Sequence, residues 1–560
     1  MNEFDFIVVG AGSAGAIVAA RLSERSDASV LLLEAGPKDR SPILHVPAAA
    51  RYAFNARRYN WNYETEPEPF LDNRRLTQPR GRVLGGSSSI NGLVYLRGNP
   101  LDYEGWAASG ITNWSYAHVL PYFRRLERWD QPRDGYQGGD GPVRVSAPTP
   151  LNPIAAAFLE AGTEAGYETT DDINGYRQEG FGRFPMNAAG GFRSSTARAY
   201  LRPARRQGNL SIWTDCLVDR IEIRGGRAEA VAFRRRGRPE TVRARREIIL
   251  SAGAINDPKI LMLSGVGQAE KLREHGIDVV QDLPGVGENL QDHAISALQL
   301  EATAPVSLTA QLGLPAKVRE TLKWLAYRDG VLASNHFQCG AFIRSEPGIP
   351  YPDLQLYLFP IAVDVGSNDF LRQHAFQVQI SPQRSRSRGW IRLRSADPDD
   401  PPRMLTNMMS KKEDWAEMRA ALRLTREILQ QPAMDPYRGR ELSPGPEVRS
   451  DEEIDAYFRQ HTHSSYHACG TCKMGNDAMA VVDAQCRVHG IEGLRVADSA
   501  IMPLIPSCNL NAPTMMIGER AADLVLGQEL EPANLSFYQD PEWQTRQRPG
   551  QPVRDVDSSG

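Results

Sequence analysis

Apolar runs and small-residue turns alternate at the start of the chain. Residues 4–9 form a mostly apolar run that is long enough for one buried strand, and residues 16–22 have the composition of a helix that packs on a sheet. Residues 30–33 form a second apolar run, which ends at Glu34. Because a short apolar run next to a glycine turn is typical of a buried strand, this pattern predicts a strand–helix–strand unit.

The turn between the first strand and the helix is a G-x-G-x-x-G sequence formed by Gly10, Gly12 and Gly15. The first glycine permits a tight turn, the second lets a pyrophosphate approach the backbone, and the third lets the helix sit on the strand. The helix N-terminus offers N–H groups to phosphates, and Glu34 lies where a carboxylate can accept hydrogen bonds from a ribose. An ordinary glycine turn is the alternative, but the strand, helix and acid in register favour a dinucleotide site. The motif alone does not separate NAD from FAD.

The hydrophobic pattern divides the rest of the chain. We expect residues 1–299 to form mainly the dinucleotide-binding domain, with a cap segment around 150–200, and residues 465–527 to return to it. Alternating strands and one amphipathic helix, at 413–430, assign residues 300–464 to a substrate-binding domain. The predicted fold is therefore mixed α/β: a Rossmann-like domain and a second domain built on an antiparallel sheet flanked by helices. Residues 528–560 are a polar tail, and we expect its last ~20 residues to be disordered.

Composition narrows the function classes. Lys and Arg number 65 against 68 Asp and Glu, so the net charge of -3 gives no bias toward nucleic acid. No apolar run approaches the ~20 residues of a spanning helix, and the first strand begins too early to leave room for a cleavable targeting segment. We therefore expect a cytoplasmic protein, with peripheral contact at the inner membrane left open. The 6 cysteines are scattered and indicate no disulfide framework.

Two further stretches carry candidate chemistry. Residues 81–92 are crowded with Gly and Ser, which lets a backbone approach a flat or phosphorylated group closely. Residues 461–475 are dense with His and Cys. A c-type haem is excluded because Lys473 follows Cys472; a zinc site lacks a second Cys pair with matching spacing; and nothing nearby resembles a thioredoxin-like redox unit. A histidine base beside a cofactor is the interpretation that we favour, and no metal site is expected.

These stretches resemble the signatures of the glucose–methanol–choline (GMC) family of FAD-dependent oxidoreductases. Residues 81–92 and 253–267 resemble its two signatures, and residues 466–475 resemble its C-terminal catalytic segment. The resemblance covers residues 4–527. Residues 58–69, 334–337 and 439–445 also resemble the choline-oxidising bacterial members of this family.

The resemblance implies FAD rather than NAD. It places Glu34 on the adenosine ribose, Val218 near the adenine, and Asp498 and Ser499 beside the ribityl chain. Some members attach FAD covalently through a histidine at the position of Ile90, so the resemblance implies non-covalent FAD here. The cofactor residues that we expect are Gly10, Gly12, Ser13, Ala14, Gly15, Glu34, Ala35, Arg82, Gly85, Gly86, Ser88, Asn91, Gly92, Val218, Asp498 and Ser499.

The resemblance also implies catalytic roles. His467 matches the family's catalytic histidine, and Asn511 matches its His/Asn partner. Oxidation of an alcohol removes a hydroxyl proton and transfers a hydride to flavin N5; a histidine can take the proton, and an amide can donate to the developing alkoxide. Tyr466 is expected to contribute to substrate specificity, whereas His461 and His463 are expected to be structural.

Two positions depart from the family pattern. Asp257 stands where the second signature usually has Ser or Thr, and we assign it no function from the sequence. Ile295 stands two residues after His293, where choline-acting relatives carry a glutamate near the trimethylammonium group. A quaternary ammonium needs a carboxylate or aromatic faces, so isoleucine should weaken choline binding. We therefore expect a less cationic primary alcohol as substrate.

Several functions remain open at this point. The leading one is an alcohol dehydrogenase that passes electrons to a quinone. The alternatives are choline dehydrogenation itself, an alcohol oxidase that uses O2, a non-redox hydroxynitrile lyase that keeps the flavin, and a binding protein with a decayed site. Intact His467 and Asn511 argue against the last of these.

Overall fold

A parallel core built from the predicted strand–helix–strand unit organises the first part of the molecule. The computed structural model describes residues 2–132, 135–148, 150–364 and 369–548. Within these residues, one seven-stranded sheet has the order β11-β2-β1-β14-β13-β12, with β25 paired to the far end of β14. Its first four strands and β25 run parallel, while β12 and β13 form an antiparallel ribbon. Its strands are β1 (Asn2–Val9), β2 (Val30–Leu33), β11 (Leu210–Trp213), β12 (Cys216–Arg224), β13 (Arg227–Arg235), β14 (Arg238–Leu250) and β25 (Leu494–Val496).

The glycine turn is as tight as the sequence predicts. Gly10 has a φ of +98°, and a Cβ there would lie 2.4 Å from the carbonyl oxygen of Ser251. A Cβ on Gly15 would lie 2.0 Å from the carbonyl oxygen of Gly10. Larger residues would therefore displace the first helix, α1 (Gly15–Arg25), from β1. The predicted strand–helix–strand unit is confirmed.

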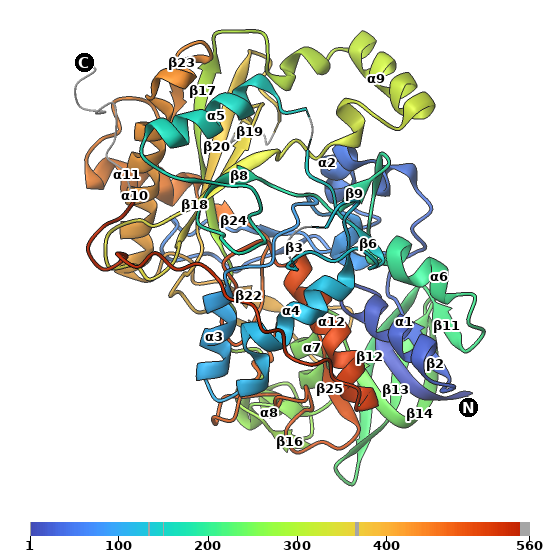
Figure 1. Ribbon diagram of the computed structural model, residues 1–560. Coiled ribbons are helices and arrows are strands. Elements are labelled where there is room, and N and C mark those ends of the chain that lie inside the picture. Colours follow the sequence, from blue (N-terminus) through green and yellow to red (C-terminus); the bar gives the residue numbers. More distant parts are fainter. Residues whose placement is uncertain (1, 133–134, 149, 365–368, 549–560) are drawn as a thin grey trace.

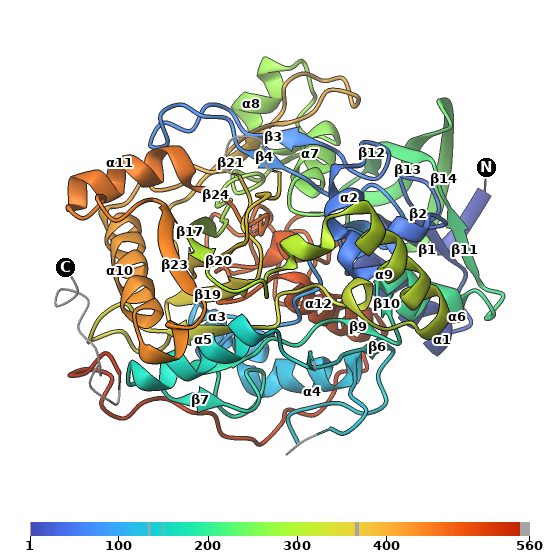
Figure 2. The same cartoon turned by 90° about the horizontal axis from the view of Figure 1, so that it is seen from above.

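A second sheet lies next to the first one: in Figure 1 it is at the upper left and the first sheet at the lower right, and Figure 2 again shows the second sheet to the left of the first. In the described part of the chain it has eight strands in the order β23-β17-β20-β19-β18-β8-β7, with β24 paired to β17, and it is largely antiparallel. The strand β17 crosses the domain boundary expected at residue 299, and β7 and β8 come from the segment expected to form a cap. Its strands are β7 (Thr169–Thr170), β8 (Gly180–Arg183), β17 (Ala294–Ala302), β18 (Cys339–Ile343), β19 (Leu354–Phe359), β20 (Ala375–Pro382), β23 (Arg438–Ser443) and β24 (His463–Ser464).

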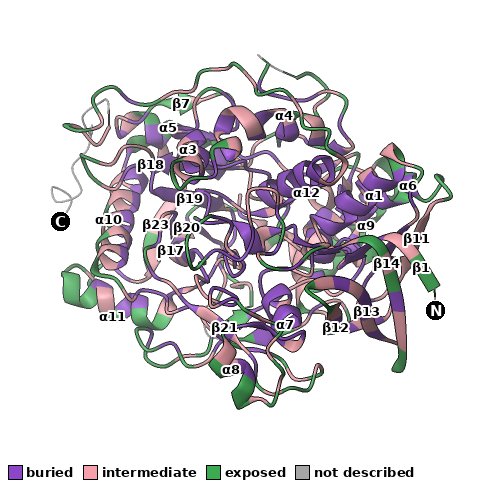
Figure 3. Ribbon diagram, turned by 90° about the horizontal axis from the view of Figure 1, so that it is seen from below, coloured by how far each residue is buried: buried purple, intermediate pink, exposed green. Residues whose placement is uncertain are grey.

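Helices cover both sheets, and the predicted helix at 413–430 is found within one residue as α10. Figure 3 shows that α1 and α12 are buried around much of their circumference, whereas α8 and α11 are partly exposed. The helices are α1 (Gly15–Arg25), α2 (Ala50–Asn55), α3 (Pro100–Ala108), α4 (Tyr116–Leu126), α5 (Pro153–Glu164), α6 (Arg202–Ala204), α7 (Asn256–Leu263), α8 (Ala269–Glu274), α9 (Leu314–Tyr327), α10 (Lys412–Leu429), α11 (Asp451–His461) and α12 (Asn511–Leu526). Short two-stranded ladders join β3 (Tyr63–Glu64) with β4 (Thr77–Gln78), β5 (Glu127–Arg128) with β6 (Val143–Arg144), β9 (Ala188–Ala189) with β10 (Phe192–Arg193), β15 (Val266–Gly267) with β16 (Gln281–Asp282), and β21 (Trp390–Arg392) with β22 (Arg403–Leu405).

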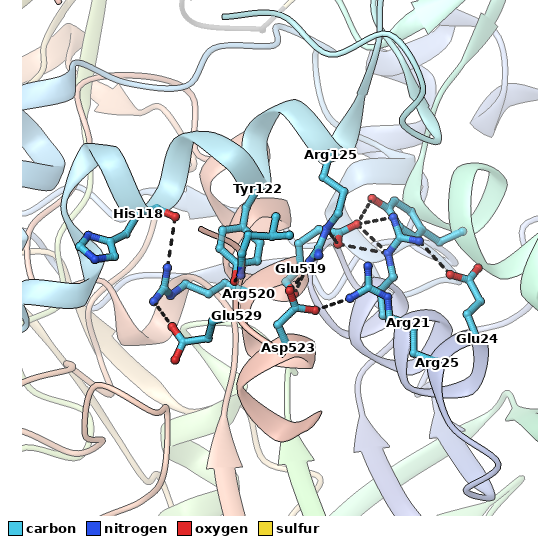
Figure 4. Close-up of polar contacts among 12 residues, drawn as sticks. Arg21, Glu24, Arg25, His118, Tyr122, Arg125, Glu519, Arg520, Asp523 and Glu529 are labelled. Carbon is cyan, nitrogen blue, oxygen red and sulfur yellow. Dashed lines mark hydrogen bonds and ion pairs between the residues drawn. The ribbon is translucent and has the colours of Figure 1, made fainter. Parts of the chain in front are cut away.

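A buried ionic network ties α1, α4 and α12 together (Figure 4). Glu519 on α12 pairs with Arg21 at 2.8 Å and with Arg125 at 2.7 Å, and Asp523, one turn later, pairs with Arg25 at 2.5 Å. Burial alone would raise the pKa of Glu519, but Arg21 and Arg125 hold it below its usual value. The network therefore fixes α12 against the helix that follows the glycine turn, so two segments 498 residues apart in sequence pack together there.

The C-terminal segment packs against the body. Asp540 is buried and pairs with Arg344 at 2.5 Å, and the Gln547 amide donates to the Arg344 carbonyl. The expectation of disorder over the last ~20 residues is therefore wrong for residues 541–548. Residues 549–560 lie outside the described part of the chain.

Candidate active site

A cavity of about 1110 Å³ is lined by residues from both sheets and their loops. The first sheet contributes the glycine turn and the ends of β2, β14 and β25, and the second contributes side chains of β17, β19 and β20. Twelve of the sixteen predicted cofactor residues line this cavity, namely Gly10, Gly12, Ser13, Ala14, Glu34, Ala35, Gly86, Asn91, Gly92, Val218, Asp498 and Ser499.

The other four predicted cofactor residues do not line the cavity. Gly15 directly follows the lining residues of the first turn, and Gly85, which has a φ of +88°, directly precedes the lining residue Gly86. Ser88 donates its hydroxyl to the Gly85 carbonyl at 2.6 Å and so braces that turn. The Arg82 guanidinium lies over the Trp61 ring, 4.8 Å from its centroid.

Glu34 is held by backbone at the end of β2. Its carboxylate accepts N–H bonds from Ala11 at 3.0 Å and Gly36 at 2.8 Å. Burial raises the pKa of Glu34 to about 7, although both N–H groups oppose that shift. The acid thus links the first turn of the dinucleotide motif to the following loop, and it also faces the cavity.

The cavity wall fits a dinucleotide that presents anionic and polar groups. A Cβ on Gly86 would lie 2.6 Å from the Cα of Gly12, so the two Gly-containing segments approach as closely as backbones can. Asn511 accepts from the Ser13 hydroxyl at 2.9 Å, and its amide nitrogen, buried in the cavity wall, has no partner among the described residues. A buried donor of this kind is satisfied when a polar ligand accepts from it. The residues present therefore fit the predicted cofactor.

The predicted catalytic histidine, His467, also lines this cavity, directly after Tyr466, which has a left-handed φ of 64°. The His467 backbone N–H donates to Asp292 at 2.8 Å. Its ring nitrogens contact two side chains: His467 Nδ1 lies 2.9 Å from His293 Nδ1, and His467 Nε2 lies 3.3 Å from Asn509 Nδ2.

These contacts define which ring nitrogen of His467 carries the hydrogen and which one has the lone pair that can accept a proton. His293 Nε2 lies 3.0 Å from the carbonyl oxygen of Gln383, which can only accept, so that nitrogen carries the hydrogen. Burial lowers the pKa of His293 to about 4, so its ring is neutral and its Nδ1 is an acceptor. His467 Nδ1 therefore donates to His293 Nδ1, and the lone pair of His467 Nε2 accepts from the Asn509 amide. Burial, followed by His293 and Arg80, also lowers the pKa of His467 well below its usual value.

The partner of His467 differs from the sequence prediction. Asn509, two residues before the predicted Asn511, directs its amide nitrogen at His467 Nε2. Its amide oxygen accepts from the Tyr357 hydroxyl at 3.3 Å, which orients the amide group. Asn511 begins α12 and contacts Ser13 instead, because the chain turns into the helix between the two asparagines. The assignment of Asn511 as the histidine's partner is therefore corrected to Asn509.

Sequence reasoning also missed the residues that support the histidine. His293 and Asp292 lie in the stretch that was singled out only for Ile295, and Asp292 is fixed by Gln78 at 2.9 Å and by Ser464. Burial raises the pKa of Asp292, while Ser464 and Arg80 oppose the shift. Their adjacency to His467 arises from pairing between β17 and β24, which a single sequence does not reveal.

The substrate side of the cavity is aromatic. Ile295 lines it together with Phe337 and Phe359, whose rings stack with centroids 4.7 Å apart. Tyr466 also lines it and packs on Phe54 at 5.0 Å. The carboxylates among the described lining residues are Glu34, Asp498 and Asp364, and the last follows β19 on the second-sheet side.

Comparison with known proteins decides the family. The GMC oxidoreductase profile matches residues 4–295 with its N-terminal part and residues 385–518 with its C-terminal part. The chain belongs to the GMC oxidoreductase family. It is therefore an FAD-dependent oxidoreductase that acts on CH–OH groups, and the predicted cofactor and fold class are confirmed.

Individual relatives of this GMC protein cover nearly its whole length. An oxygen-dependent choline dehydrogenase of Brucella suis is 47% identical over 549 residues, which cover 98% of this chain and 100% of the relative. An enzyme of the same name from Chromohalobacter salexigens is 50% identical, covering 96% of this chain and 97% of the relative. Among solved structures, pyridoxine 4-oxidase from Mesorbium loti has a TM-score of 0.84 at 30% identity, covering 92% of this chain and 98% of the other. Aspergillus oryzae formate oxidase has a TM-score of 0.87 at 25% identity, covering 94% and 98%.

The described residues contain neither a metal-binding cluster nor a membrane-spanning helix. No group of three or more His, Cys, Asp or Glu side chains is arranged to hold a metal ion. No helix among them has the length and apolar character needed to cross a membrane.

Proposed function

We propose that this GMC protein oxidises a primary alcohol to its aldehyde, with His467 as the base. His467 Nε2 takes the hydroxyl proton, since it is the ring nitrogen left with a lone pair. The Asn509 amide, which lies 3.3 Å from His467 Nε2 in the structure, would donate to the same substrate oxygen once the substrate is bound and negative charge develops on that oxygen. FAD, bound non-covalently, supplies the hydride acceptor. The single observation that carries the proposal is the His293–His467–Asn509 arrangement on the cavity wall.

We further propose an uncharged or weakly polar alcohol as the substrate. Ile295 and the Phe337–Phe359 stack offer an apolar surface, and among the described lining residues of the second-sheet side Asp364 is the one carboxylate for a cationic head group. Steady-state kcat/KM values for choline and for aliphatic and aryl primary alcohols test this proposal. Choline as clearly the best substrate would overturn it.

Choline is the second candidate substrate, and specific observations favour it. The relatives at 47–50% identity are named choline dehydrogenases, and aromatic faces together with Asp364 can bind a quaternary ammonium. The same kinetic comparison separates the two candidates.

The electron acceptor is proposed to be a quinone, with O2 as the alternative. The word "oxygen-dependent" in the relatives' names favours the alternative. Stoichiometric peroxide formation in air during alcohol oxidation would identify an oxidase, whereas turnover that requires a quinone or dye would identify a dehydrogenase.

A further inference from the structure

One face of α9 is apolar and exposed. Leu314, Val318, Leu322 and Leu325, at helical spacings of four, four and three, are 75%, 52%, 61% and 53% exposed. Figure 1 shows α9 projecting from the body above α2, at the upper right. Contiguous exposed apolar side chains of this kind mark interaction surfaces in soluble proteins. We call these four residues the α9 stripe.

The opposite side of α9 is firmly attached, so the stripe is not a poorly packed helix face. Trp324 is buried, and its indole N–H donates to the Gly191 carbonyl at 2.8 Å. Its ring also packs edge-on against Phe192, with centroids 5.3 Å apart. The anchored side fixes the outward direction of the stripe.

Basic side chains share the exposed part of α9 with the stripe. Lys317 and Lys323 are exposed, and Arg319 pairs with the acid of this helix, Glu320, at 3.0 Å. A symmetric contact between two copies would bring these like charges together, whereas anionic lipid head groups complement them. We propose that the α9 stripe docks this protein on an anionic lipid bilayer.

Docking would place the cavity entrance at the bilayer. Lys317 and Thr321 line the cavity, as do Leu308 and Leu312 just before the helix. An apolar alcohol or a quinone dissolved in lipid could then enter without crossing water. This consequence, unlike the docking itself, rests on the proposed function.

Vesicle sedimentation of the FAD-loaded protein tests the docking. We expect binding to phosphatidylcholine vesicles that contain phosphatidylglycerol, weaker binding to pure phosphatidylcholine, and a roughly tenfold or greater loss of binding for L322D/L325D. The matched control V280D/M479D adds two carboxylates at exposed apolar positions away from α9 and should bind as wild type does. Oxidation of a water-soluble alcohol with a soluble dye should be unchanged in both variants, so its failure would count against the proposed function alone.

Three outcomes would overturn the docking proposal. One is wild-type protein that binds neither kind of vesicle, and another is L322D/L325D that binds as wild type does. The third is a wild-type dimer in light scattering that L322D/L325D converts to a monomer, because the stripe would then be a self-association surface.

A second, independent observation concerns Asp257, the residue that departs from the family signature. It lies in the first turn of α7, fully buried, and its Oδ1 accepts from the Ala252 N–H at 2.8 Å. Asp498, which lines the cofactor cavity, accepts from the N–H groups of Gly253 at 2.6 Å and Ala500 at 2.8 Å. The two buried carboxyl groups lie close enough to interact.

The hydrogen bonds that the two carboxyl groups receive indicate which of them carries a proton. Asp257 Oδ2 is buried and receives no N–H or O–H from the described residues, whereas both oxygens of Asp498 accept backbone N–H groups. Only a proton on Asp257 Oδ2, donated to Asp498, satisfies both groups. The geometry points to Asp257 as a protonated carboxylic acid that positions Asp498 in the cofactor wall.

The surroundings of the pair agree with a bound proton. Burial, followed by the Asp498 charge, raises the pKa of Asp257 well above its usual value. The other titratable group facing the pair is Cys472, whose pKa burial also raises, so it brings no positive charge. Lys259 on the same helix is directed away, toward the carbonyl groups of Pro398 and Asp400.

Two substitutions separate a donating Asp257 from an ionised one. D257N keeps a donor for Asp498 and an acceptor for the Ala252 N–H, so we expect it to retain FAD as wild type does. D257L keeps neither, and we expect at least tenfold weaker FAD retention, measured as free flavin fluorescence after ultrafiltration. Loss of FAD from D257N to the same extent as from D257L would overturn the proposal.

Infrared spectroscopy tests the proton directly and does not depend on whether D257L folds. The wild-type minus D257N difference spectrum at pH 7 should contain the carbonyl-stretch band of a protonated, buried carboxylic acid. Its absence, with only carboxylate bands in the difference, would contradict the assignment.

Discussion

The two sides of the cavity are built by different means. On the cofactor side, glycines at fixed spacing let backbone segments approach within contact distance, and backbone N–H groups hold Glu34. On the substrate side, His467, His293 and Asn509 come from three distant segments and are oriented by one another's side chains. The glycine turn of the first side is a local property of the sequence, whereas the second side exists only when both sheets have formed. Substitutions on the two sides should therefore affect different measurements.

The sharpest test of this difference is the substitution H467A. Removing the base should lower the rate of anaerobic flavin reduction by roughly 10²–10⁴-fold, the usual contribution of a positioned general base. The FAD content should stay at the wild-type level, because His467 supports no part of the glycine-rich wall. Loss of FAD from H467A would show that the two sides are not separable.

The two neighbouring asparagines offer a closer comparison. N509A removes the amide that faces His467 Nε2, so we expect flavin reduction to slow by roughly 10²-fold with FAD content unchanged. N511A removes the unpartnered donor beside Ser13, so we expect weaker FAD retention and a near-normal reduction rate in the loaded fraction. The reverse pattern would restore Asn511 as the catalytic partner.

Substitution at Ile295 probes specificity within the substrate side. I295E introduces a carboxylate beside the aromatic stack. It should raise the ratio of kcat/KM for choline to kcat/KM for an uncharged alcohol by roughly tenfold, which corresponds to ~1–2 kcal/mol of additional binding free energy for the cation. I295Q is the uncharged control of similar size and should leave the ratio near its wild-type value. An unchanged ratio in I295E would mean that position 295 does not face the substrate's head group.

The smallest expected effect is a displaced pH profile. Since the pKa of His467 is lowered, the base is already unprotonated at neutral pH, and kcat/KM should fall only as pH drops below the ordinary histidine range near 6.5. In N509A the pH at which kcat/KM begins to fall should differ from that of the wild type, while kcat/KM should stay constant at alkaline pH. A limb above pH 7 in the wild type would contradict the lowered pKa.

The same difference explains what could be predicted from the sequence. The strand–helix–strand unit and its glycine turn follow from local spacing, because a glycine turn specifies its own geometry. Val218, Asp498 and Ser499, which also line the cavity, were expected only from the family resemblance. The partner of His467 was placed at Asn511 rather than Asn509, since the start of α12 decides which of two nearby asparagines faces the histidine. His293 was missed because its contact with His467 depends on the pairing of β17 with β24, 174 residues apart at the two rings.

Anaerobic reduction of the bound flavin by a primary alcohol tests the central claim most directly. In stopped-flow mixing, the oxidised-flavin absorbance of the wild type should bleach rapidly, and that of FAD-loaded H467A should persist for at least roughly 10²-fold longer. Bleaching of H467A at the wild-type rate would show that another group takes the proton, and the account of the site given by His467, His293 and Asn509 would be wrong.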